Sequence, residues 1–149
     1  MAYIKVLRII LSAWLFIPAL VYAQCDFEAY LDSCKTHVTH DHFNYLKDYQ
    51  IDNEHGAKQK VEYSIALVDG FDYEYYFTGY KEGHQEVIAT LSDSNRKKLG
   101  TNKHHKNFVH VIHHSCRKTG IYYITFTFKD EEEYCGAAVL GFIKHPDEG

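Results

Sequence analysis

The sequence is poor in several features that mark large protein classes. It has one tryptophan, one methionine and two prolines in 149 residues, and no apolar run reaches the roughly 20 residues that a membrane-spanning helix needs. The motifs G-x-S-x-G and H-E-x-x-H, a phosphate-binding glycine-rich loop and a dinucleotide fingerprint are also missing. These absences argue against the common hydrolases, metalloproteases and nucleotide-dependent enzymes, and they favour a non-enzymatic role.

The longest apolar run lies near the start of the chain, where Ile9–Val21 follows Lys5 and Arg8 and leads into Val21-Tyr22-Ala23. A basic start, a short apolar stretch and small residues at the end are typical of a secretory signal peptide. We therefore predict a signal peptide over residues 1–23 and a secreted or periplasmic mature protein without a membrane span. An uncleaved N-terminal anchor is the alternative.

Cleavage near Ala23 would remove two basic residues and leave 14 against 20 acidic ones, a net charge of −6. Nucleic acids and anionic membranes both require a basic face, so this balance argues against them. We expect instead a protein or glycan partner in the cell envelope or the extracellular space. The 11 histidines would make the chain more positive below about pH 6.

The first part of the mature chain has a helical pattern. Apolar residues recur at i, i+3, i+4 and i+7, namely Phe27, Tyr30, Leu31 and Cys34. A second periodic piece follows at Phe43 and Leu46, before a polar connector. We predict a helical, His-rich segment over residues 24–59 that packs on the rest of the domain.

After Lys60 the apolar residues alternate with polar ones, which is the pattern of strands with one solvated face. The predicted strands cover residues 61–67, 71–77, 87–91, 108–116, 121–128 and 134–143. Asp69-Gly70 is a typical hairpin turn, and Val139–Ile143 is apolar enough for a central strand that is buried on both faces. We predict an antiparallel, jelly-roll-like β-sandwich over residues 60–144, with a flexible tail over residues 145–149.

Four cysteines in an exported chain suggest two disulfides, and they can pair in three ways. We favour Cys116–Cys135 together with Cys25–Cys34. The alternative is a crossed pairing, which would tie the N-terminal segment to the sandwich. A zinc site is disfavoured because no C-x2-C spacing is present.

The candidate metal ligands are His37, His40, Asp41 and His42, because neutral imidazoles and one carboxylate could hold zinc or copper. We favour the interpretation that these residues form a solvated surface turn, and we therefore expect no cofactor. His110 and His114 flank Ile112 on one face of the strand over 108–116, and His113 lies on the other. A third ligand such as His104 or His105 would be needed there. The acidic run at residues 130–133 lacks the ligand spacing of a calcium loop.

The candidate ligand-binding residues are the tyrosines of one predicted hairpin, Tyr73, Tyr75, Tyr76 and Tyr80. Tyr76 falls on the face opposite Tyr73 and Tyr75, where an exposed ring could stack on a sugar or a peptide. Ordinary cross-strand aromatic pairing at the rim of the sandwich is the interpretation that we favour.

Three segments carry a resemblance to a known kind of module: V-E-Y-S-I-A-L-V-D-G-F-D-Y-E-Y-Y-F, V-I-A-T-L-S-D and T-G-I-Y-Y-I-T-F. Over about Val61–Ile143 this order is similar to small exported bacterial β-sandwich modules, such as pre-peptidase C-terminal domains and proteins of GOLD-like architecture. The resemblance implies a jelly-roll-like sandwich and a non-catalytic binding or accessory role, and it assigns no site residue. A metal-binding protein, including a metal-dependent hydrolase, and an inhibitor or adhesin that uses a sheet edge are the alternatives.

Overall fold

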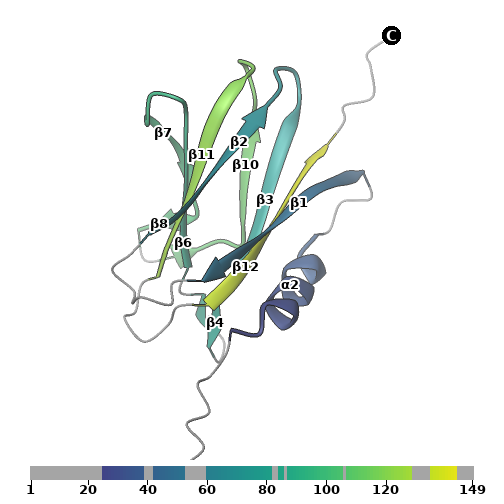
Figure 1. Cartoon of the computed structure of the whole chain (residues 1–149), viewed down its shortest axis with the longest axis vertical. Helices are drawn as coiled ribbons and strands as arrows, with labels where there is room; N and C mark the ends of the chain where they lie inside the picture. Colours follow the sequence, from purple (N-terminus) through teal and green to yellow (C-terminus); the bar gives the residue numbers. More distant parts are fainter. Residues whose placement is uncertain are drawn as a thin grey trace, which may run out of the picture.

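The computed structural model describes residues 25–38, 42–52, 60–81, 84–85, 87–105, 107–128 and 135–143. Two four-stranded antiparallel sheets pack face to face, with one helix on the outside (Figure 1). The sequence-based prediction of a mainly β, antiparallel sandwich is confirmed. Residues 1–23, predicted as a signal peptide, and the tail at 145–149 lie outside the described residues. No helix in the described part of the chain is long and apolar enough to span a membrane.

The sheet on the helix side, which we call sheet A, has the strand order β1-β12-β3-β10. Its strands are β1 (Phe43–Asp52), β12 (Cys135–Ile143), β3 (Asp72–Thr78) and β10 (Val111–Ser115). Sheet B has the order β2-β11-β6-β7. Its strands are β2 (Val61–Leu67), β11 (Gly120–Phe128), β6 (Val87–Ser92) and β7 (Lys98–Thr101). Two short pairs complete the described strands: β4 (Tyr80–Lys81) with β5 (His84–Gln85), and β8 (Lys103–His104) with β9 (Asn107–Phe108).

The strands of the two sheets pair in a nested order. Strand β1 pairs with β12, β2 with β11, β3 with β10 and β6 with β7. Each connection therefore passes from one sheet to the other, apart from the β6–β7 hairpin within sheet B. Such nesting is the jelly-roll-like arrangement.

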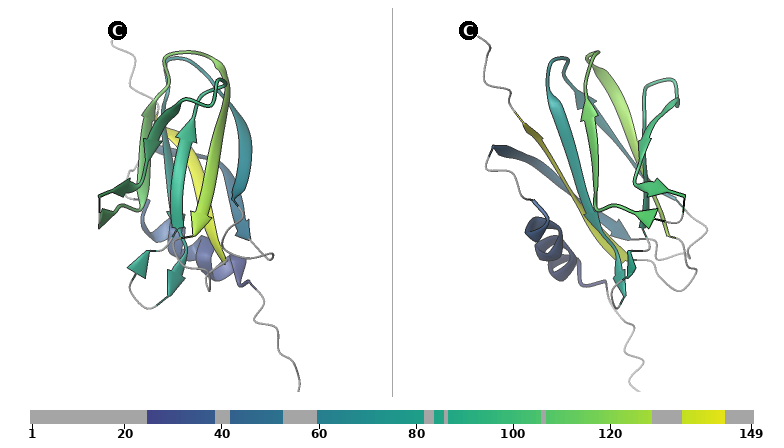
Figure 2. Two further views of the ribbon diagram at one scale, coloured as in Figure 1. Left: turned by 90° about the vertical axis from the view of Figure 1, so that its left-hand side faces the viewer. Right: turned by 180° about the vertical axis from the view of Figure 1, so that it is seen from behind.

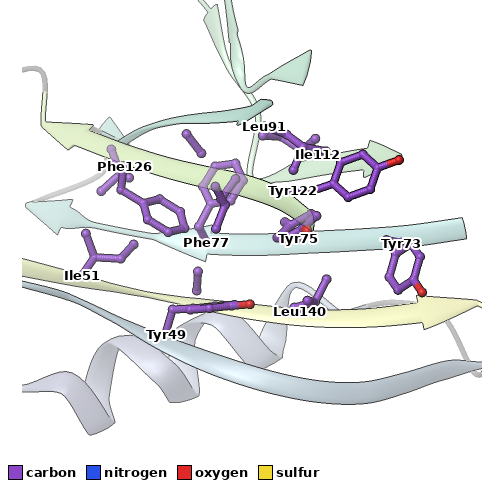
Figure 3. Packing of buried hydrophobic residues seen from close by; sticks show 14 of the residues in the cluster. Tyr49, Ile51, Tyr73, Tyr75, Phe77, Leu91, Ile112, Tyr122, Phe126 and Leu140 are labelled. Atoms are coloured by element: carbon purple, nitrogen blue, oxygen red, sulfur yellow. The ribbon is translucent and has the colours of Figure 1, made fainter. Parts of the chain in front are cut away.

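The interface between the sheets is the main core, and it is rich in aromatic rings (Figure 3). Its fully buried members include Tyr75 and Phe77 from sheet A and Phe126 and Ile124 from sheet B. Strand β11 shows how sheet B contributes to this core, because its side chains alternate between buried and partly exposed positions along the strand. The predicted period of two therefore directs one face of sheet B into the core.

The helix α2 (Phe27–Thr36) covers the other face of sheet A, over β12 and β3 (Figure 1). Asp26 caps it, since the Asp26 carboxylate accepts a hydrogen bond from the backbone N–H of Ala29 at 3.2 Å. Leu31 and Cys34 are its buried residues. Because α2 lies on one face and sheet B on the other, β12 is buried on both faces from Cys135 to Gly141, as its apolar sequence predicts.

Two local predictions are wrong. The segment predicted as helical over residues 24–59 contains the strand β1 after α2, because Tyr49 and Ile51 alternate into the core and β12 supplies a partner strand. Asp69-Gly70 does form a turn, with Gly70 at φ 87°. That turn joins β2 of sheet B to β3 of sheet A and so makes no hairpin.

Candidate functional site

The tyrosines proposed as a ligand-binding surface are inside the protein. Tyr73 and Tyr75 point into the core between the sheets, and the prediction that Tyr76 is exposed is wrong, because it is 3 % exposed beside α2. Strand β3 is therefore covered on both faces. The side chain of Tyr80 lies outside the described residues. The rings of Tyr73, Tyr75 and Tyr76 are not available for a ligand to stack on.

The cysteines pair differently from the favoured prediction. One disulfide joins Cys25 to Cys135, with their Cα atoms 5.5 Å apart, so the favoured pairs Cys25–Cys34 and Cys116–Cys135 are wrong. The observed bond belongs to the crossed alternative, which ties the N-terminal segment to the sandwich. Cys34 and Cys116 are free, and both are buried. They cannot pair in this structure because Cys34 lies between α2 and sheet A, whereas Cys116 belongs to the core between the sheets.

The proposed histidine-rich metal site is only partly described. The ring of His37 stacks on that of His110, with centroids 4.4 Å apart and planes 12° from parallel. His42 is exposed, and His40 and Asp41 lie outside the described residues. Within the described ranges, no three His, Cys, Asp or Glu side chains are placed to hold a metal ion. Burial and the neighbouring His37 both lower the pKa of His110, because each disfavours a charged imidazole.

A buried carboxylate orients another histidine on the same sheet. Glu74 of β3 is 2 % exposed, and its Oε1 lies 2.8 Å from Nδ1 of His113 on the neighbouring strand β10. The hydroxyl of Tyr76 donates to the other carboxylate oxygen at 3.0 Å. Nδ1 of His113 therefore faces the buried acid, and the His113 side chain remains 62 % exposed at the surface.

His114 has a different environment from His113, as alternation along the strand predicts. It lies on the core side of β10, opposite Tyr73, and its ring contacts Tyr122. Burial lowers the pKa of His114, and its Nε2 has no hydrogen-bond partner in the described structure. The side chains of His113 and His114 therefore lie on opposite faces of β10.

A basic side is the feature that the sequence analysis missed. Residues 96–118 contain seven lysines and arginines, five histidines and no acidic residue, whereas the remainder of the chain after residue 23 has 20 acidic and seven basic residues. This segment forms β7, the β8–β9 hairpin and β10, with parts of the adjoining turns. A running count of charge along the chain would have found it.

The fold gathers this segment along one narrow side of the sandwich, seen in the left view of Figure 2. Strands β7 and β10 are edge strands of opposite sheets, and they are neighbours, because Gly100 lies against Ile112. The N–H of Val109 also donates to the carbonyl of Asn102 at 3.0 Å. Seven exposed side chains form what we call the basic side: Lys97, Lys98, Lys103, His104, His105, Arg117 and Lys118.

The charges of the basic side are not neutralised internally. Arg96, next to it, donates to Glu62 and lies over the ring of Tyr123 on the outer face of sheet B. None of the five lysine and arginine side chains of the basic side forms an ion pair within the described structure. Their positive charge is therefore available to a partner.

The other two edge strands are β2 and β1, and β1 is the longer one; it pairs only with β12 among the described strands. Tyr45 and Leu46 on it are 54 % and 45 % exposed. A bulge between Tyr45 and Lys47 interrupts its register, and the hydroxyl of Tyr63 donates to the carbonyl of Gln50. Bulges and side-chain caps of this kind protect an edge against pairing with another strand.

A comparison with protein-family models and a comparison with curated proteins both give no match. The chemistry of the described residues is therefore the basis for assigning a function.

Proposed function

We propose that the protein is an exported, non-enzymatic binding module that recognises an anionic polysaccharide through its basic side. The observation that carries this proposal is the acid-free segment 96–118, whose exposed cations lie together along one narrow side of the sandwich. Export is supported by the predicted signal peptide, and the Cys25–Cys135 disulfide fits an extracellular or periplasmic protein.

A polysaccharide is favoured over a nucleic acid by the lack of aromatic rings on the basic side. Phe108 is the only aromatic residue between positions 96 and 118 apart from histidine. It is half-buried, and the Lys103 ammonium lies 5.9 Å from its ring centroid. Single-stranded nucleic acids are held by stacking of bases on such rings as well as by charge. Carboxylate or sulfate groups spaced along a glycan need only the cations.

The first prediction tests the charge of the basic side. We expect the triple variant Lys97→Glu, Lys98→Glu, Lys103→Glu to bind sulfated or carboxylated polysaccharide at least about 10-fold more weakly, because three cations become repulsive. Binding by the parent protein should also weaken as salt is raised. Heparin and polygalacturonate are the probes, neutral dextran is the ligand control, and calorimetry measures the affinities.

The matched control reverses three exposed lysines elsewhere, Lys35, Lys47 and Lys60, so that the change in net charge is identical. Equal losses in both triple variants would show that net charge alone matters and would contradict the proposal. Tighter binding to DNA or to phosphatidylglycerol vesicles than to either polysaccharide would overturn the assignment of the ligand class.

A further inference from the structure

The helix α2 is joined to sheet A by one covalent bond at its N-terminal end. Cys25 lies two residues before the helix and Cys135 opens β12. Apart from this disulfide and the main chain that continues from α2 to β1, α2 is held by noncovalent contacts on the outer face of β12 and β3. Leu31 and Cys34 are its only fully buried residues, with Phe27 and Tyr30 partly buried. Helices of ten residues are marginal on their own in water, so the attachment of α2 depends strongly on its surroundings.

The sandwich does not need α2 for its own core. The eight strands of the two sheets pair with one another, and the main core consists of residues from the strands and the Cys116 turn. The helix belongs to a second, smaller cluster with Tyr76 and Val139 on the outer face of sheet A. Release of α2 therefore uncovers one face of sheet A and leaves the layer between the sheets in place.

Each of the two layers contains one free thiol: Cys34 lies between α2 and sheet A, and Cys116 lies between the two sheets. Cys34 is completely buried, and its Sγ lies 3.4 Å from the carbonyl oxygen of Ala137 under α2. Burial raises the pKa of the Cys34 thiol to about 12, which keeps it unreactive. Cys116 is 1 % exposed within the core, where its Sγ lies 3.6 Å from the hydroxyl of Tyr122.

The helix keeps Cys34 away from its own N-terminal end. Residues Phe27–Cys34 are helical, so about 10 Å of helix separates Cys34 from the first turn, which Cys25 and Asp26 precede. The Sγ of Cys34 is buried under α2 against Ala137. Movement of α2 is required before a reagent in solution can reach Cys34.

We propose that the Cys25–Cys135 disulfide is a redox-exchange site that fastens α2, and that its reduction releases α2 and exposes the Cys34 thiol while the sandwich stays folded. The reductant is a dithiol oxidoreductase of the same compartment. One of its thiolates attacks the sulfur of Cys25, which is half-buried, and Cys135 leaves as a thiolate that takes up a proton. The second thiol of the oxidoreductase then displaces Cys25, so that the oxidoreductase gains a disulfide and this protein gains two thiols.

The test is cysteine alkylation followed by mass spectrometry, on the disulfide-bonded protein before and after reduction by a thioredoxin-like dithiol at pH 7.5. In the oxidised protein neither Cys34 nor Cys116 should react. After reduction we expect Cys34 to react on the order of 100-fold faster, the typical size of the stabilisation that a disulfide gives to the part of the structure that it holds. Cys116 should remain unreactive. The variant Cys25→Ser should give the same result for Cys34 without any reductant.

Two outcomes would overturn the proposal. If Cys25 and Cys135 become alkylated while Cys34 stays as slow as in the oxidised protein, α2 does not depend on the disulfide. If Cys34 and Cys116 become reactive at the same rate, with loss of the far-ultraviolet circular dichroism of the strands, the disulfide holds the whole domain together and is not a local fastening. Neither outcome bears on polysaccharide binding, which the basic side carries independently.

Discussion

At the scale of single residues, a buried carboxylate and a ring stack determine how the histidines of sheet A are placed. Glu74 accepts a hydrogen bond from the Tyr76 hydroxyl and lies 2.8 Å from Nδ1 of His113, and His37 at the end of α2 lies on the ring of His110. The sequence identifies these histidines as unusual, but it does not show which of them lie together. Proximity along the chain suggested a metal site at residues 37–42, whereas the described contacts of His37 reach across to His110, far away in sequence.

The second prediction concerns the pH dependence of stability. The pKa of His110 is lowered from 6.5 by burial and by His37, so below pH 6.5 the unfolded chain takes up more protons than the folded protein. Folding stability therefore falls as the pH is lowered from 7.5 to 5.5. The variant His110→Gln, which cannot become charged, should lose less thermal stability over this range than the parent protein.

Thermal unfolding at several pH values measures this effect, and the exposed residue His42 provides the control variant His42→Gln. Some acid sensitivity should persist in His110→Gln, because burial also lowers the pKa of His114. A parent protein that is equally stable at both pH values would contradict the prediction.

At the scale of elements, close approach of β12 to β3 explains the glycine at position 136 in β12. A methyl group on Gly136 would lie 2.5 Å from the carbonyl oxygen of Thr78 in the neighbouring strand. That oxygen is part of the backbone and cannot move aside easily. The sequence predicts β12 as a central strand from its apolar residues, but it does not show which neighbour restricts each position.

The third prediction follows from this contact. We expect Gly136→Ala to lower the free energy of unfolding by about 1–3 kcal/mol, the usual cost of overpacking a buried site. The control is Gly120→Ala, because nothing lies within 4 Å of a Cβ at Gly120 and its φ is not positive. Urea unfolding of both variants provides the comparison, and equal effects would contradict the prediction.

The elements also show where sequence patterns succeed and fail. The strands β2, β3, β6, β11 and β12 follow their predicted ranges closely because alternation is a local property. The strand predicted over residues 108–116 is shorter in the structure, where β10 covers Val111–Ser115. Strand β1 was predicted as helix, since the spacing of Phe43 and Leu46 fits a helical face and a bulge between Tyr45 and Lys47 disturbs the alternation. The burial of Tyr76 was missed because it depends on α2, which reaches β3 only in the folded chain.

At the scale of the whole molecule, the choice of ligand depends more on where the charges lie than on the net charge. The predicted mature chain has a net charge of −6, yet the acid-free segment from 96 to 118 lies along one side. The overall charge argued against polyanionic partners in general. In the folded protein this objection no longer holds, because neighbouring edge strands bring these cations together. Salt screens them from carboxylates farther away than the Debye length of about 8 Å.

The sequence by itself determined the β-rich class, most strand positions, the amphipathic helix and the apolar central strand, because these depend on periodicity and local propensity. Only the tertiary structure decided the cysteine pairing, the covering of Tyr76 and the gathering of the basic side. Each of these depends on which distant segments become neighbours: Cys25 and Cys135 are separated by 110 residues in sequence. Such long-range pairing follows from packing the whole chain into two sheets and one helix, and no local pattern encodes it.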